Sequence, residues 1–267
     1  MKRVGLRAAV LAAGLCLSML VALPGGAIVG GQLDGSRHPE VGALVFDRDG
    51  EKALICSGSL ISSTVYMTAA HCLDFLISEG VAPHDVWVSF DPTFDSSSRL
   101  HRGTYYQNPD FGSSSKDPHD VAVVVLDHAQ RTTPAQLPTL GRLDQMKRQG
   151  TLSSTLFTTV GYGDIRTSKS GGPNVFQFDG QRRYATQSFQ SLNSVWLTLS
   201  QNPATGNGGT CFGDSGGPHY FGAGSNETKV VASITVTGDP NCRSTDTTYR
   251  VDTQSARSFL GQFVTLP

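Results

Sequence analysis

Short apolar runs separated by glycine, serine, aspartate and proline dominate the chain. Residues 86–90 alternate apolar with other positions, and residues 121–126 form an unbroken apolar run. Short runs of this kind, bounded by turn residues, are typical of antiparallel strands. We therefore predict strand structure at residues 41–46, 53–55, 59–61, 65–68, 86–90, 103–106, 121–126, 152–160, 181–199, 229–237 and 247–251.

Two segments carry a helical pattern instead. Residues 72–76 predict a short helical turn just after His71. Near the C-terminus, Asp252 is placed to cap a helix at about residues 252–264. The apolar face of that helix would hold Ala256, Phe259, Leu260 and Phe263.

Chain breakers divide the sequence into two halves. Residues 131–150 contain the chain breakers Pro134, Pro138 and Gly141 and predict the connection between the halves. Residues 163–180 are polar and glycine-rich and predict an exposed loop. We expect an N-terminal half at about 28–140 and a C-terminal half at about 150–251, followed by the final helix.

The composition supports a turn-rich β protein. Of 267 residues, 30 are glycine and only 16% are charged, a profile less suited to a helical bundle. The formal net charge is −1, and residues 1–27 hold three basic residues and no acid, so the rest of the chain stands near −4. This balance excludes a polybasic surface for nucleic acid.

Residues 1–27 have the pattern of a secretory signal peptide. A start with Lys2, Arg3 and Arg7 is followed by an apolar core at residues 8–23 and by small residues that suit cleavage. The apolar run is shorter than the roughly 20 residues that a membrane span needs. We predict a secreted, extracellular domain at residues 28–267 with no membrane anchor once the signal is removed.

Four cysteines remain after the signal peptide, which removes Cys16. They are Cys56, Cys72, Cys211 and Cys242. An even number in an exported chain predicts disulfides, and three pairings are open on this count. Zinc is the competing interpretation, but the chain has no Cys-x-x-Cys pair, so we expect no metal site.

Candidate chemistry lies at residues 209–218, where Ser215 stands among glycines beside Asp214. A serine hydroxyl is a poor nucleophile unless a base lies within hydrogen-bonding reach. Glycines suit tight turns that point backbone N–H groups at a ligand, so the N–H groups of Gly213 and Ser215 are candidates for an oxyanion hole. By itself the stretch is equally compatible with a plain Gly-Asp-Ser turn.

Two upstream segments supply a base and a carboxylate. His71 follows two alanines and precedes Cys72, and it is the candidate base among seven histidines. Asp120 opens the apolar run 121–126, and a carboxylate there needs a donor, which the His71 imidazole N–H supplies. Asp117 is the rival, but a proline follows it and no apolar run does.

These segments, in the order His, Asp, Ser, resemble the trypsin/chymotrypsin family of secreted, S1-type serine proteases. VGYG at residues 160–163 and IVGG at residues 28–31 resemble two further motifs of that family. The likeness runs from Ile28 to about Val264. It implies an all-β, chymotrypsin-like fold of two six-stranded antiparallel β-barrels and a C-terminal helix, with the site in the cleft between the barrels.

The resemblance also implies two disulfides and an activation step. It pairs Cys56 with Cys72 and Cys211 with Cys242. In the family, a free N-terminal amine folds inward and pairs with the aspartate before the catalytic serine. Here the Ile28 amine would pair with Asp214 and order the loop that carries Gly213 and Ser215.

The residue before Ile28 is alanine, whereas trypsin-activated zymogens have arginine or lysine there. We therefore expect signal peptidase itself to make the activating cut. The alternative is cleavage after Ala22, which would leave residues 23–27 as a propeptide for another protease.

The implied activity is that of an endopeptidase. His71 would take the Ser215 proton, Asp120 would fix the imidazole tautomer, and the N–H groups of Gly213 and Ser215 would bind the oxyanion before an acyl-enzyme forms. No cofactor is needed. The implied partners are protein or peptide substrates and protein protease inhibitors, and we expect a monomer.

Specificity follows from the primary pocket that the resemblance implies. Gly209 stands where trypsin-like enzymes have an aspartate, so the charge that attracts Arg or Lys is missing. Thr235, Thr237 and Thr247 would form the walls of a shallow pocket for small or medium apolar residues. Bulky apolar residues stay open as an alternative, and Asp246 pointing inward would favour basic ones.

Two other classes of protein compete with this interpretation. A catalytically silent binding protein can share the same fold, since fold does not dictate function. Residues 213–217 also fit the Gly-x-Ser-x-Gly elbow of α/β-hydrolases, but those enzymes need Asp and His after the serine. Too short a segment follows Ser215 for that arrangement.

Overall fold

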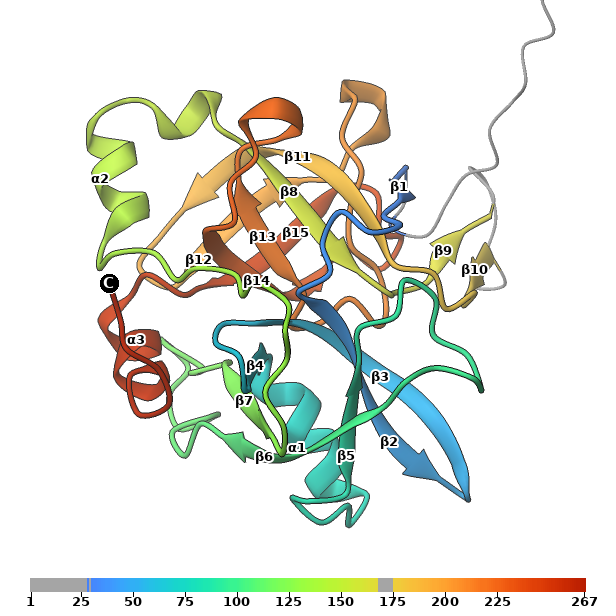
Figure 1. Ribbon diagram of the computed structural model, residues 1–267. Helices are drawn as coiled ribbons and strands as arrows, with labels where there is room; N and C mark the ends of the chain where they lie inside the picture. Colours follow the sequence, from blue (N-terminus) through green and yellow to red (C-terminus); the bar gives the residue numbers. More distant parts are fainter. Residues whose placement is uncertain (1–27, 29, 168–174) are drawn as a thin grey trace, which may run out of the picture.

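Two β-barrels form the protein in the computed structural model, one stacked on the other (Figure 1). The structure describes residue 28 and residues 30–167 and 175–267, so the predicted signal peptide lies outside the described residues. The first barrel is closed in the order β2-β3-β4-β7-β6-β5. Its strands are β2 (Val41–Arg48), β3 (Glu51–Leu60), β4 (Val65–Thr68), β5 (Val86–Ser89), β6 (His101–Gln107) and β7 (Ala122–Leu126).

The second barrel is a sheet that closes on itself. Its order is β1-β11-β12-β15-β14-β13-β8, and a further β11–β8 pairing completes a six-stranded ring with β1 attached outside. Its strands are β1 (Gln32–Leu33), β8 (Leu156–Gly161), β11 (Arg183–Leu192), β12 (Trp196–Ser200), β13 (Pro218–Phe221), β14 (Val231–Gly238) and β15 (Thr245–Arg250). Every strand pair in both barrels is antiparallel, so the predicted fold class is confirmed.

A small hairpin stands apart from the two barrels. It pairs β9 (Ile165–Arg166) with β10 (Phe176–Gln177). It falls inside the segment predicted as an exposed loop, and the residues that join its two strands lie outside the described part of the chain.

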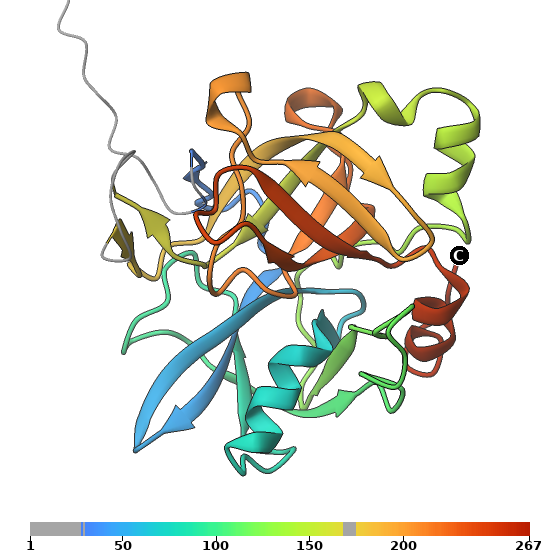
Figure 2. The same cartoon turned by 180° about the vertical axis from the view of Figure 1, so that it is seen from behind.

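The described residues form three α-helices, which lie at the barrel edges (Figure 2). They are α1 (Ala70–Ser78), α2 (Arg142–Arg148) and α3 (Gln254–Leu260), and short 3₁₀ turns occur at η1 (Leu152–Ser154), η3 (Pro203–Thr205) and η4 (Gly224–Asn226). Helix α1 extends two residues beyond each end of the predicted turn, and its buried face also includes Ala70. Among the described residues, no helix is long and apolar enough to cross a membrane.

The capping residue of α3 differs from the prediction. Thr253, not Asp252, is the N-cap, and its side chain accepts a hydrogen bond from the Ala256 N–H. Asp252 is fully buried, where it pairs with Arg250 and accepts the Leu143 N–H. The predicted N-cap was wrong by one residue because the Asp252 carboxylate is engaged in this buried ion pair.

The core runs from the first barrel into the second. One apolar cluster joins first-barrel residues such as Leu44 and Val123 to Tyr162 and Ile234 of the second half and to Phe259 of α3. Helix α3 therefore returns to the first barrel, where Phe263 lies against Tyr106 with ring centroids 5.3 Å apart. A second cluster packs α2 onto the second barrel. The two halves are thus held together by shared apolar packing.

Candidate active site

His71 and Asp120 meet because their strands are neighbours. Strands β4 and β7 pair with Thr68 opposite Ala122, so the residues just after β4 and just before β7 lie side by side. Asp120 Oδ2 lies 2.8 Å from His71 Nδ1, and Asp120 Oδ1 accepts the His71 backbone N–H at 2.9 Å. A carboxylate at Nδ1 places the ring proton there and leaves Nε2 as the acceptor.

The alternative carboxylate, Asp117, is hydrogen-bonded to a side chain other than that of His71. Asp117 accepts a hydrogen bond from the Tyr249 hydroxyl at 3.0 Å. His119, which adjoins Asp120, turns its Nδ1 toward Ser255 Oγ at 2.7 Å. The structure therefore brings Asp120, and neither of these neighbours, to His71.

Ser215 comes from the second half of the chain, in the turn before β13. Its carbonyl oxygen accepts the Ser57 N–H at 2.9 Å, and Cys72 Sγ lies 4.0 Å from the same oxygen. These contacts seat the serine beside the disulfide that adjoins His71. The hydrogen bonds of the described residues do not include one from Ser215 Oγ to His71 Nε2, and such bonds are often long before substrate binds.

The backbone around Gly213 leaves two N–H groups available. Gly213 has φ +92°, a conformation that favours glycine. The carbonyl of Phe212 accepts the Asp164 N–H at 2.7 Å, so the N–H of Gly213, on the opposite side of that peptide, is directed away from Asp164. Within the described part of the chain, neither Gly213 nor Ser215 uses its N–H in a hydrogen bond. Both donors are thus open to a ligand.

Asp214 is fully buried behind this turn. Its two carboxylate oxygens accept the N–H groups of Gly163 and Cys211, each at 2.8 Å. Burial raises the pKa of Asp214 to about 7, although the two N–H bonds act against that rise. A Cβ on Gly161 or Gly163 would overlap the carboxylate, which explains why both positions are glycine.

Asp214 forms no ion pair with any of the described residues, so its carboxylate has no cation beside it there. Ile28 is itself fully buried, and a Cβ on the nearby Gly30 would lie 3.5 Å from Gly208 Cα. Gly30 therefore packs against the second half of the molecule. A buried carboxylate without a partner is costly, so this site suits an incoming positive charge.

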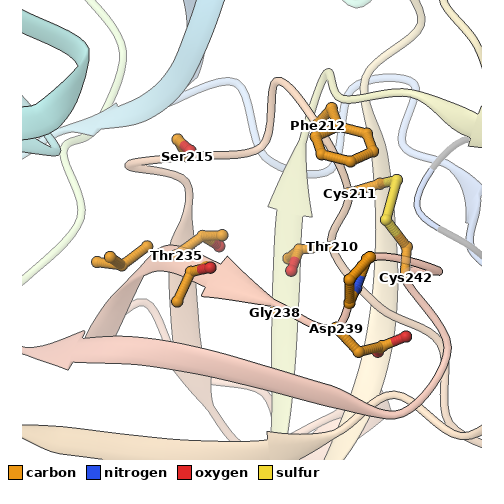
Figure 3. A pocket seen from close by; sticks show the side chains of 11 residues that line it. Thr210, Cys211, Phe212, Ser215, Thr235, Gly238, Asp239 and Cys242 are labelled. Carbon is orange, nitrogen blue, oxygen red and sulfur yellow. A yellow bond between two sulfur atoms is a disulfide. The ribbon is translucent and has the colours of Figure 1, made fainter.

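A pocket of about 130 Å³ opens beside Ser215 (Figure 3). Small-molecule sites usually span roughly 300–1,000 Å³, so this pocket is small. Of the predicted pocket residues, Thr235 and Thr237 line it, whereas Gly209 and Thr247 are not among its lining residues. The other lining residues are Thr210, Cys211, Phe212, Val236, Gly238, Asp239, Pro240 and Cys242.

Two acids lie near the pocket: Asp239 is one of its lining residues, and Asp246 is not. Asp246 is fully buried, where Oδ2 lies 3.0 Å from His219 Nε2 and accepts the Gln187 side-chain N–H. Asp239 lines the pocket, but Figure 3 shows its carboxylate turned away from Ser215. The backbone N–H groups of residues 241 and 243–245 donate to it. Burial would raise the pKa of Asp239, but these donors lower it below its usual value.

Phe212 and Asp239 are among the pocket residues that sequence reasoning missed. Phe212 is 58% exposed at the rim and packs edge-on against Phe176 of the β9–β10 hairpin, with ring centroids 5.3 Å apart. Its position directly before Gly213 was a signal that could have identified it. Asp239 could not be placed because its loop is short and irregular.

Both predicted disulfides are present: Cys56–Cys72 beside His71 and Cys211–Cys242 in the pocket wall. The sulfurs of Cys56 and Cys72 and a ring nitrogen of His71 lie within 4.8 Å of one another. Metal ions bind the thiolate form of cysteine, and the disulfide removes it. The disulfide therefore accounts for this grouping without a metal ion.

Two closed antiparallel barrels with these features define the chymotrypsin-like fold. The family model for trypsin matches residues 28–259, and the chain belongs to this family. Trypsin delta and trypsin gamma of Drosophila melanogaster are each 26% identical over 175 residues, 62% of this chain and 64% of theirs. Kallikrein 1-related peptidase b27 of Mus musculus is 28% identical over 182 residues, 61% of this chain and 65% of that protein. The chain thus spans slightly less than two thirds of the length of these curated relatives.

Proposed function

We propose that this protein is a secreted serine endopeptidase. The observation that carries the proposal is the hydrogen bond between His71 and Asp120 together with the two open N–H groups beside Ser215. The His71–Asp120 pair provides a base, and the two N–H groups provide an anion site next to the Ser215 nucleophile.

The chemistry is acyl transfer from a peptide bond. Ser215 Oγ attacks the carbonyl carbon while His71 Nε2 takes its proton, and the N–H groups of Gly213 and Ser215 hold the oxyanion. The imidazolium, stabilised by Asp120, then gives the proton to the leaving amine as the C–N bond breaks. Water, deprotonated by His71, attacks the acyl-enzyme and restores the serine.

Activation requires the Ile28 amine. Cleavage between residues 27 and 28 creates an ammonium group, and the proposed partner is the buried Asp214. That pairing would supply the missing cation and lower the pKa of Asp214 from its raised value. We propose that signal peptidase makes this cut and that export and activation are one event.

The substrates we propose are proteins or peptides with a small or medium apolar residue before the cut bond. Support comes from the small pocket, its threonine walls and the backbone N–H groups that engage the Asp239 carboxylate. Protein inhibitors that present such a residue are the further partners, and the enzyme acts as a monomer.

A phosphonate serine-hydrolase probe tests the function directly. The secreted protein should begin at Ile28 and gain one adduct, mapped to Ser215, whereas Ser215→Ala should gain none. Intact mass spectrometry measures both results. A chain that begins at Ile28 and does not react would show a binding protein instead, and an unreactive chain with extra N-terminal residues would show a zymogen.

A further inference from the structure

Gln201, which directly follows β12, is buried next to the primary pocket. The residue is 1% exposed and adjoins two residues that line the pocket, Gly238 and Asp239. A Cβ added to Gly209 would overlap Gln201 Cβ and Oε1, and a Cβ on Gly238 would lie 3.4 Å from Gln201 Nε2. The Gln201 side chain therefore occupies the volume into which a side chain at position 209 would extend.

Hydrogen bonds fix the direction of the Gln201 carboxamide. Nε2 donates to Asp239 Oδ1 and to the Thr245 carbonyl, each at 3.1 Å. Both partners only accept, so the nitrogen must face them. Oε1 is then turned toward Gly209, where it is buried and has no partner among the described residues.

Oε1 is one of several buried polar side-chain atoms that have no partner among the described residues. Next to a binding pocket, the donor to such an acceptor is a water molecule or part of a bound side chain. A fixed, neutral carboxamide with one open acceptor therefore adjoins the pocket. This explains in physical terms why Gly209 carries no side chain: any larger residue there would displace Gln201.

We propose that Gln201 determines specificity by setting the depth of the primary pocket. This inference rests on the proposed function. A short substrate side chain ends above the carboxamide and leaves room for a water molecule to donate to Oε1. A bulky apolar or long basic side chain needs the volume that Gln201 occupies and is rejected.

Two variants separate the volume of Gln201 from its hydrogen bonds. Gln201→Ala empties that volume, and Gln201→Met keeps its length but removes both polar atoms. The measurement is kcat/KM for peptide substrates that differ only in Ala, Leu or Phe before the cut bond, with active sites titrated by the phosphonate probe. Gln201→Ala should raise the Phe-to-Ala ratio of kcat/KM by about tenfold or more, and Gln201→Met should keep the parent ratio.

Each result has a definite meaning. An unchanged Phe-to-Ala ratio in titrated Gln201→Ala overturns the inference, and so does an equal rise in Gln201→Met. If Gln201→Ala gives no titratable sites, Gln201→Asn replaces it, because it is one methylene shorter and keeps the amide. A Leu-to-Ala ratio in Gln201→Asn that does not exceed that of the parent then overturns the inference. A parent protein that does not react with the probe overturns the proposed function instead, so the two failures are distinguishable.

Discussion

A single carboxylate controls the His71 imidazole. Asp120 is 3% exposed and accepts two N–H groups of the same histidine, one from the backbone and one from the ring. The backbone bond fixes where the carboxylate stands, and the ring bond fixes which nitrogen carries the proton. Orientation and tautomer are thus set by one residue.

Asp120→Asn should therefore nearly abolish turnover without unfolding the protein. The two N–H groups of His71 bond to different oxygens of Asp120, and asparagine replaces one of these oxygens by an NH₂ donor. An NH₂ group facing Nδ1 favours the tautomer with the proton on Nε2. We expect kcat to fall by a factor on the order of 10⁴. Peptide hydrolysis by titrated enzyme measures it, with Asp117→Asn as the control at near-parent activity. A loss of similar size in Asp117→Asn would contradict the assignment.

Site residues that stand in a distinctive local sequence could be predicted. Residues that reach the site only because the chain folds could not. His71, Asp120 and Ser215 each stand in a distinctive run, so they were identified, although their catalytic roles stay predictions. Gln201 has no such signal, because only folding brings it to Gly209. Thr247 was expected in the pocket lining and is not among the lining residues, although β15 pairs it with the lining residue Thr237.

At the scale of elements, strands were easier to predict than helices. Apolar runs marked β5 and β7 within one residue of their bounds, because these strands pack into the barrel core. Helix α2 was missed because Pro134, Pro138 and Gly141 directly precede it and indicated a connection instead. Its Leu143 and Met146 pack on the second barrel, a tertiary contact that the local pattern does not reveal.

The two disulfides differ in their position relative to the primary pocket. They close loops with sequence separations of 16 and 31 residues, and each should contribute about 3 kcal/mol to the free energy of unfolding. Only Cys211–Cys242 lines the primary pocket. Replacing both of its cysteines by alanine should therefore raise KM severalfold, in addition to lowering stability.

The matching pair of replacements at Cys56 and Cys72 is the control. This double replacement should lower the free energy of unfolding by a similar amount and leave the preference among Ala, Leu and Phe substrates unchanged. Denaturant unfolding of inhibited protein and steady-state kinetics measure the two effects. Equal rises of KM in both double variants would show that the pocket wall does not depend on its disulfide.

At the scale of the whole molecule, a buried ionic network ties the segment after Ile28 to the second barrel. Arg182 is 1% exposed and donates through Nε to Asp34 at 2.7 Å. His38 lies between two carboxylates, with Nδ1 against Asp34 and Nε2 2.7 Å from Glu227. Its ring also stacks on Tyr220. The network joins parts of the chain that are nearly 190 residues apart.

This network should make the stability of the protein depend on pH. Burial alone would lower the pKa of His38, but the hydrogen bonds and charges of Asp34 and Glu227 raise it from 6.5 to about 9. The folded state therefore binds the proton more tightly than the unfolded chain does. The resulting stabilisation, about 3 kcal/mol, is complete below pH 6.5 and is lost as the pH rises through 9.

His38→Gln isolates this contribution from those of other groups. Urea unfolding in a Ser215→Ala background, which prevents self-cleavage, should show parent stability falling between pH 6.5 and 9, and His38→Gln should lack most of that fall. The Ile28 amine titrates in the same range, but it is common to both proteins and cancels in the comparison. Because Asp34 and Glu227 lose their cation, the variant should also be less stable at pH 6. An identical pH slope in the two proteins would mean that His38 is not the proton-binding group.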